Sequence, residues 1–274
     1  MGHLAPHMST ERQVHRHAAH FLAEHPVFTL ADLETAMRPR TNTGLQSWVK
    51  YRLRTGAMVQ VERGVYAAVP PGADPRSFTP DPFVAAAAVR DDAVFAYHAA
   101  LQVLGAAYSV HRTLTVLTSR RRRPLQVGDT RVEFQPHPAS LERRKATRLG
   151  VLKLRYRGRV LATTGRERTL VDGFRKPSLL GGLEELLQSA AGFPSLDFLL
   201  LRQILQAYNQ RALWAAVGWF LECHRRTFRV LDGFLDEAAL HRPVSPHYLP
   251  RRQRGQGGRY VSRWNLVLPE ELRA

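Results

Sequence analysis

The chain has 274 residues, 44% of them hydrophobic and 23% charged, as in folded globular proteins and unlike disordered ones. The single cysteine, Cys223, excludes an intramolecular disulfide and a cysteine-rich zinc cluster. The net charge of +17 favours a polyanionic partner, because basic side chains displace the counterions condensed on phosphates. We see no apolar stretch long enough to span a bilayer and no signal peptide, so we expect a cytoplasmic protein with no membrane partner.

Residues 8–69 have the pattern of three short helices followed by a β-hairpin. Residues 1–7 precede a second methionine, Met8, and we expect them to be a vector-derived tail. Alternation over Met58–Val69, broken at Glu62-Arg63-Gly64, predicts the hairpin. Apolar residues at helical spacing predict the helices over Thr10–His25, Leu30–Met37 and a stretch from Thr41-Asn42-Thr43 to the stop at Gly56. This order is that of a winged helix-turn-helix domain.

Residues 70–82 contain many prolines and no periodicity, which predicts a linker. Beyond it we expect helices over Pro82–Arg90 and Ala96–Leu104, then strands over Thr113–Thr118, Arg131–Gln135, Val151–Tyr156 and Arg159–Ala162. The last third is expected to be helical, over Arg166–Phe174, Leu183–Ala191, Leu196–Tyr208 and Arg211–His224, with a final strand within Ser262–Leu268. The predicted fold is therefore α+β, with the winged helix at 8–69 followed by a mixed α/β domain over 83–274 that ends in a helical segment.

The third predicted helix has a face suited to DNA. In a winged helix this helix enters the major groove, where glutamine can bind adenine and lysine a guanine edge or a phosphate. With the apolar residues inward, the outward residues are Thr43, Gln46, Ser47, Lys50 and Arg54. Phosphate contacts are expected from Thr41, Asn42 and Thr43 at the helix start and from Arg63 and Gly64 at the hairpin tip. The alternative is a domain that docks a protein instead of DNA.

A dense run of arginines lies in the middle of the chain. Residues 73–176 carry 20 basic and 9 acidic side chains, a net charge of +11. The run Arg120-Arg121-Arg122-Arg123 falls between two expected strands and is therefore a loop. Adjacent arginines repel one another unless an anionic group lies near, so we interpret the loop as a contact for DNA, RNA or a toxin protein. An ordinary solvated turn is the alternative.

The sequence offers little support for an enzyme. Asp129 and Glu133 resemble the acidic pair of a metal-dependent nuclease, but Arg131 between them and the absence of a suitably placed lysine make a poor Mg²⁺ site. No cysteine or carboxylate completes a zinc set with the histidines near the start of the chain. We therefore expect no enzyme, no cofactor and no metal, and keep a nuclease as the alternative of another class.

Residues 167–172 have the spacing of a structural latch. Arg168 and Asp172 are i, i+4 partners on one helix face, and Thr169 can bond to the preceding turn. Glu167 and Asp172 lie about 140° apart around the helix, which disfavours a catalytic pair.

Four stretches of the chain follow one another in a specific order. They are Leu45…Gly56 with Arg63-Gly64-Val65-Tyr66; Tyr97-His98-Ala99-Ala100-Leu101 with Gly105; Glu167-Arg168-Thr169-Leu170-Val171-Asp172 with Pro177 and Gly181-Gly182-Leu183-Glu184-Glu185; and Gly218-Trp219-Phe220-Leu221-Glu222. This order resembles the AbiEi-type antitoxins of type IV toxin–antitoxin systems over nearly the whole chain. The third stretch is the most specific. Ala99 stands where that family usually has serine, and the arginine expected before Gly218 is absent.

The resemblance implies different functions for the two domains. The N-terminal domain would bind inverted repeats in its own promoter, with two copies per operator, and repress it. The C-terminal domain would counter a nucleotidyltransferase-like toxin, at the toxin or at its RNA target. A repressor that acts without a toxin is the alternative.

Overall fold

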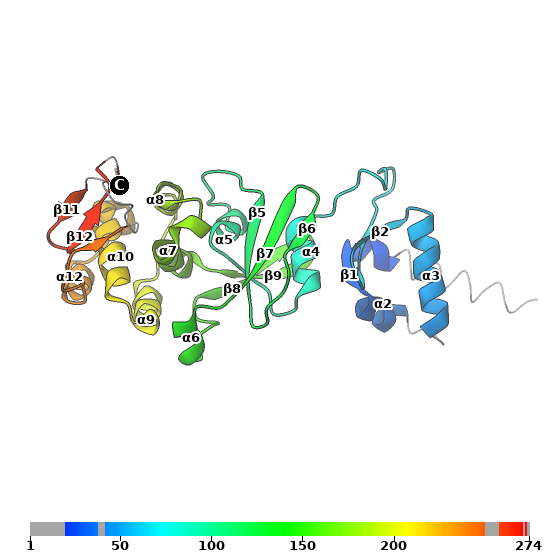
Figure 1. Ribbon diagram of the computed structural model, residues 1–274, viewed down its shortest axis with the longest axis horizontal. Helices are drawn as coiled ribbons and strands as arrows, with labels where there is room; N and C mark the ends of the chain where they lie inside the picture. Colours follow the sequence, from blue (N-terminus) through cyan, green and yellow to red (C-terminus); the bar gives the residue numbers. More distant parts are fainter. Residues whose placement is uncertain (1–19, 38–41, 250–257, 271, 273–274) are drawn as a thin grey trace, which may run out of the picture. The chain divides into compact units, whose positions relative to one another are not determined.

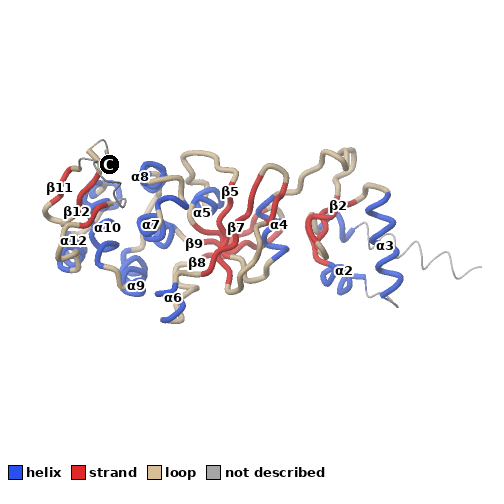
Figure 2. Tube along the Cα trace, in the orientation of Figure 1, coloured by secondary structure: helices blue, strands red, loops and turns tan. Residues whose placement is uncertain are grey.

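The computed structural model describes residues 20–37, 42–249, 258–270 and 272. The helices and strands are labelled in Figure 1 and coloured by type in Figure 2. The chain divides into two compact units. The first unit consists of residues 1–93, 124–132 and 155–161, and the second of residues 94–123, 133–154 and 162–274. Among the described residues, no helix combines the length and the apolar character needed to cross a bilayer.

The first unit contains two of the expected helices and the expected hairpin. Residues 20–24 are helical and His25 is not, and the part of the first expected helix before residue 20 lies outside the described residues. The elements that follow are β1 (Val27–Thr29), α2 (Leu30–Met37), α3 (Asn42–Arg54), β2 (Met58–Glu62) and β3 (Val65–Ala68). The strands pair antiparallel in the order β1-β3-β2, so β1, which was not predicted, adds a strand to the hairpin.

Local contacts set these boundaries. At the start of α2 the backbone N–H of Thr29 donates to the Asp32 carboxylate (2.8 Å), and the N–H of Asp32 donates to Oγ1 of Thr29 (3.1 Å). This reciprocal cap satisfies N–H groups that have no partner within the helix. Gly56 follows α3 with φ +72°, a conformation that glycine adopts at little cost. The helices and strands enclose a core formed by Phe21, Phe28, Leu33, Leu45, Val49, Met58 and Tyr66.

Residues 70–81 form neither helix nor strand, as expected for the linker, but they pack against other elements of the first unit. Pro75 lies directly against Gly56, and Phe78 packs on an apolar cluster that joins β1 and β3 to α4 (Pro82–Val89). Asp81 caps α4 by accepting hydrogen bonds from the backbone N–H groups of the next turn. The compact unit therefore continues beyond residue 69, where the sequence placed its end.

A six-stranded sheet has the strand order β6-β7-β5-β4-β9-β8. Its strands are β4 (Val94–Ala96), β5 (Thr113–Thr118), β6 (Leu125–Val127), β7 (Thr130–Pro136), β8 (Val151–Tyr156) and β9 (Arg159–Thr164). Strand β4 runs antiparallel to β5 and parallel to β9. The predicted helix Ala96–Leu104 is wrong at its start, because Ala96 belongs to β4 and the helix, α5, spans His98–Val103. Tyr97, with φ 56°, turns the chain between the strand and the helix.

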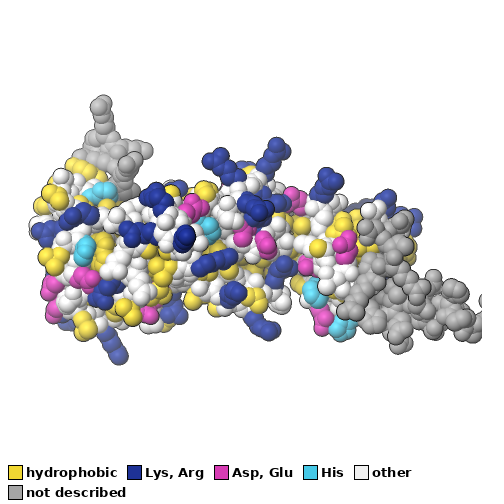
Figure 3. All heavy atoms as spheres, turned by 90° about the horizontal axis from the view of Figure 1, so that it is seen from below, with side chains coloured by type: hydrophobic (Ala, Val, Ile, Leu, Met, Phe, Trp, Pro, Cys, Tyr) yellow, Lys and Arg dark blue, Asp and Glu magenta, His cyan; other side chains and the backbone are white. Residues whose placement is uncertain are grey.

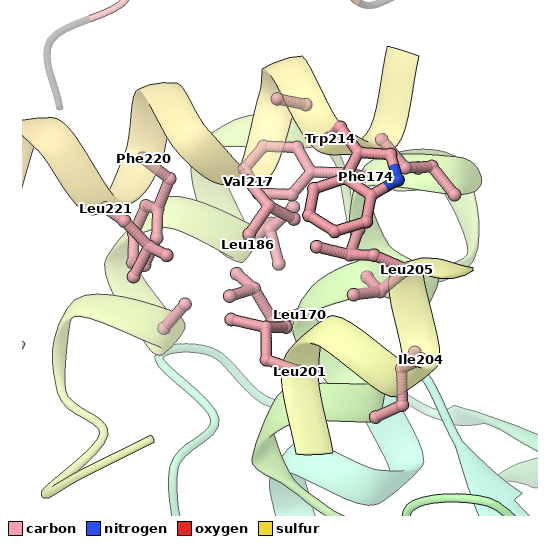
Figure 4. Packing of buried hydrophobic residues seen from close by; sticks show 14 of the residues in the cluster. Leu170, Phe174, Leu186, Leu201, Ile204, Leu205, Trp214, Val217, Phe220 and Leu221 are labelled. Carbon is pink, nitrogen blue, oxygen red and sulfur yellow. The ribbon is translucent and has the colours of Figure 1, made fainter. Parts of the chain in front are cut away.

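The C-terminal part is mainly helical, and the α+β class is confirmed. Its elements are α6 (Ala139–Arg143), α7 (Arg166–Arg175), η1 (Pro177–Leu179), α8 (Leu183–Ala191), α9 (Phe198–Tyr208), α10 (Arg211–Cys223), α11 (Arg225–Phe228), α12 (Asp232–Leu240), β10 (His247–Tyr248), β11 (Arg259–Val261) and β12 (Leu266–Leu268). Leu170 and Phe174 of α7 share one core with Leu186 of α8 and with Trp214 and Val217 of α10 (Figure 4). Helices α7 to α10 follow the predicted pattern closely, whereas α6, α11 and α12 were not predicted.

Candidate nucleic-acid interface

Helix α3 presents one face to the core and the opposite face to solvent. Leu45 and Val49 are buried in the core of the first unit, and Trp48 and Leu53 pack against it. The side chains predicted to point outward and described here are all exposed: Gln46, Ser47, Lys50 and Arg54. The exposed face therefore offers an amide, a hydroxyl and two cations along a single helix.

All charged side chains of α3 are cationic. The helix contains three cations, Lys50, Arg52 and Arg54, and no carboxylate. The Arg54 guanidinium lies 5.6 Å from the ring centroid of exposed Tyr51, while the half-buried Arg52 lies 5.2 Å from that of Trp48. A helix of this composition attracts anionic groups and contains no acidic side chain to repel them.

The hairpin tip adds a further exposed cation. Arg63 is exposed, and Gly64 has φ +79° with open space where a Cβ would lie. The Gly64 carbonyl accepts a hydrogen bond from the N–H of Leu30 (2.8 Å), which ties the tip to the start of α2. Thr41 lies outside the described residues, as do the side chains of Asn42 and Thr43, so the predicted phosphate contacts at the helix start stay predictions.

The arginine run forms a loop, as predicted, between β5 and β6. Arg120, Arg121 and Arg123 are exposed, whereas the half-buried Arg122 lies 5.7 Å from the ring centroid of Phe134. The Thr118 hydroxyl donates to the carbonyl of Arg120 (2.9 Å) and fixes the start of the loop. Lys and Arg side chains are prominent on the face shown in Figure 3. The loop belongs to the second unit and α3 to the first, so each is a separate candidate surface.

The motif at residues 167–172 is buried in the second unit. Arg168 and Asp172 are fully buried and form the predicted ion pair, with Nε of Arg168 at 2.9 Å from the carboxylate. Arg168 also donates to the Leu149 carbonyl (2.9 Å), and the Tyr208 hydroxyl donates to Asp172. Burial, and next the charge of Asp172, raise the pKa of Tyr208, so this phenol stays protonated and remains a donor.

Thr169 and Glu167 of the motif form hydrogen bonds of their own, with residues outside it. The hydroxyls of Thr169 and Thr164 lie 2.7 Å apart, and Glu167 accepts a hydrogen bond from the N–H of Asp197 (2.8 Å). Glu167 and Asp172 thus have different partners and do not form a carboxylate pair. These contacts are those of the predicted latch.

The carboxylates considered for a nuclease lie on the six-stranded sheet. Asp129 is exposed in the turn between β6 and β7, and Glu133 is half-buried on β7. Within the described part of the chain, the one group of three potential metal ligands is elsewhere and includes neither residue.

That group consists of His98, His111 and Glu185, and sequence reasoning missed it. The two imidazole rings are stacked with their centroids 3.7 Å apart, and Nε2 of His98 lies 3.5 Å from Oε1 of Glu185. Burial, and next the charge of His111, lower the pKa of His98. Gly181, with φ +99°, lies so close to the His111 ring that a Cβ there would collide with it. The stretch Tyr97–Leu101 and the stretch Gly181–Glu185, far apart in the sequence, therefore meet at this group.

The fold has a counterpart among solved structures. The crystal structure of the RV2827C protein from Mycobacterium tuberculosis is similar with a TM-score of 0.61 and 17% sequence identity, over 97% of this chain and 93% of that chain. At this identity the similarity concerns the fold. No protein-family model and no curated protein matches the sequence.

The buried ion pair gives a stability prediction. We expect Asp172→Asn to lower the free energy of unfolding by about 3–5 kcal/mol, because the Arg168 guanidinium would stay buried without its counter-charge. The matched control is Asp236→Asn, which removes an exposed carboxylate paired with Arg263 at 3.0 Å and should cost at most about 1 kcal/mol. Urea unfolding of both variants measures the difference, and equal losses would contradict the structural role of the pair.

Proposed function

We propose that this protein binds double-stranded DNA through a winged helix-turn-helix in its first unit, with α3 as the recognition helix. The observation that carries the proposal is the exposed face of Gln46, Ser47, Lys50 and Arg54 on a helix that has no carboxylate. The order of α2, α3 and the β2–β3 hairpin, with β1 paired to β3, supports the winged-helix assignment.

The chemistry of each side chain defines its role in this proposal. Gln46 can donate to and accept from the major-groove edge of adenine, and Lys50 can reach a guanine edge or a phosphate. Arg54 and, at the hairpin tip, Arg63 are exposed, and in this proposal they contact backbone phosphates. Two copies on an inverted repeat would contact half-sites about 34–36 Å apart, or a multiple of that distance.

We further propose that the DNA is the protein's own promoter and that the second unit counters a nucleotidyltransferase-like toxin. This part of the proposal rests on the AbiEi-like order of motifs in the sequence. A repressor that acts alone is the competing hypothesis. The two are distinguished by the neighbouring gene, since an antitoxin requires a toxin encoded beside it.

The DNA-binding face is tested by the triple variant Gln46→Ala, Lys50→Ala, Arg54→Ala. We expect it to bind a labelled duplex from the gene's upstream region roughly 100-fold more weakly, since each lost contact costs at least about 1 kcal/mol. Gln46→Ala alone should relax the preference at one base pair, whereas Lys50→Ala should weaken binding to all sequences alike. Fluorescence anisotropy at fixed salt measures both effects.

The control replaces the same three residue types in the second unit. Lys176, Gln203 and Arg226 are exposed there, and their alanine variant changes the net charge by the same amount. Its affinity should match that of the unmodified protein. Equal binding by the two triple variants would rule out α3 as the DNA contact.

A variant of the arginine loop distinguishes a contact with DNA from a contact with the toxin. We expect the variant Arg120→Ser, Arg121→Ser, Arg123→Ser to keep the salt dependence of DNA binding and to lose protection of toxin-expressing cells. Arg122 is left in place because it packs beside Phe134. If the loop instead lies along DNA, the slope of log affinity against log salt flattens by about 0.9 for each lost phosphate contact. A variant with normal slope and normal protection would make the loop a solvated turn.

A further inference from the structure

His98 is a buried imidazole without satisfactory hydrogen bonds. It begins α5, directly after the turn at Tyr97, and is 1% exposed. Among the described residues neither ring nitrogen has a hydrogen bond of good geometry, and the nearby Ser109 backbone and Glu185 carboxylate give only long or poorly aligned contacts. Because a buried polar atom without a good partner is unfavourable, the ring nitrogens of His98 are available to a ligand other than a hydrogen-bonding side chain.

Two further donors lie beside His98, each from a different part of the second unit. His111 comes from the segment before β5, and its backbone carbonyl accepts a hydrogen bond from Gln102 (3.4 Å). Glu185 comes from α8. One potential ligand atom of each of the three residues lies within 4.8 Å of the other two.

The separation between His98 and Glu185 has the value that a shared ion requires. Nε2 of His98 and Oε1 of Glu185 are 3.5 Å apart, at the limit of a hydrogen bond. Two donors that each lie about 2.1 Å from a tetrahedral ion are themselves about 3.4 Å apart. The imidazole and the carboxylate are therefore near enough to share one ion, and Oε2, which accepts a single hydrogen bond from the described part of the chain, is the carboxylate oxygen with a lone pair to offer.

The Glu185 carboxylate is held in place by its neighbours. Oε1 accepts hydrogen bonds from the N–H groups of Tyr108 (3.1 Å) and Ser109 (3.2 Å) and from the Ser189 hydroxyl (2.9 Å). Oε2 accepts only the Ser109 hydroxyl (2.7 Å) within the described residues and keeps a free lone pair. Such outer contacts orient a ligand and are a regular part of metal sites.

His111 completes the group after a change of ring orientation. The two rings are nearly parallel, at 7°, and an ion cannot lie in both ring planes at once. His111 is only half-buried, so its ring can turn toward the ion, whereas Gly181 packs against one edge of the ring. Binding should therefore unstack the two imidazoles.

We propose that His98, His111 and Glu185 form a binding site for a divalent transition-metal ion, and the donor set favours Zn²⁺. Two imidazoles and one carboxylate leave the fourth tetrahedral position to water. A bound ion would hold helix α8 against the segment between α5 and β5. The inference does not depend on DNA binding, because α3 belongs to the first unit.

The test is titration of the chelator-treated full chain with Co²⁺, a spectroscopic substitute for Zn²⁺. We expect intense visible absorption bands of a tetrahedral site, which one equivalent of Zn²⁺ removes. His111→Gln and Glu185→Gln should each abolish these bands and weaken binding at this site by more than about 100-fold, which exceeds the usual effect of losing an outer contact. Zn²⁺ should also raise the melting temperature of the unmodified protein and not that of His111→Gln.

Two controls separate loss of a ligand from loss of structure. Ser109→Ala removes a hydrogen bond to Glu185 but no ligand, so it should keep the bands. His241→Gln removes an imidazole that stacks on Trp214, away from the three ligands, and should also keep them. Histidines before residue 20 are common to all variants, so metal bound there cancels from the comparison. Unchanged bands in His111→Gln and Glu185→Gln, or no bands in the unmodified protein, would overturn the proposal.

Discussion

The buried guanidinium of Arg168 is the constraint around which the second unit is organised. A charge fully removed from water is tolerated only with a close counter-charge and hydrogen bonds, and Arg168 has both in Asp172 and the Leu149 carbonyl. Tyr208 of α9 donates to the same carboxylate, so the pair within α7 also fixes α9. Asp172 accepts hydrogen bonds from Arg168 and Tyr208, and Arg168 donates to the Leu149 carbonyl, so this network joins α7, α9 and the residues before β8.

The rest of the second unit follows from the position of α7. Helix α7 packs its apolar residues against α8 and α10, and α8 brings Glu185 to the imidazoles of His98 and His111. Tyr97 precedes His98 and contacts Arg175 of α7 through its hydroxyl, which links the turn after β4 to the same buried network. In the first unit a separate core buries the apolar residues of α3 and leaves its opposite face exposed, which is the face proposed to bind DNA.

The sequence predicted individual helices and turns better than it predicted sites assembled from distant segments. Helix α2 was predictable with its exact bounds because Thr29 and Asp32 form a reciprocal cap, and the inward and outward faces of α3 followed from the spacing of Leu45, Val49 and their neighbours. Strand β4 was missed because Val94–Ala96 is buried on both faces and has no alternation to distinguish it from a helix. The group of His98, His111 and Glu185 had no signal in sequence spacing, since its members come together only through the fold. The AbiEi resemblance stays a prediction about partners.

Site-specific crosslinking tests the central claim, that the exposed face of α3 contacts DNA, most directly. In a Cys223→Ser background, Ser47→Cys places a photoactivatable group on that face, and Ser245→Cys places the same group on an exposed position of the second unit. We expect efficient crosslinks from position 47 to a duplex of the upstream region, confined to a short stretch within each repeat. Crosslinks from position 245 that equal or exceed those from position 47 would contradict it.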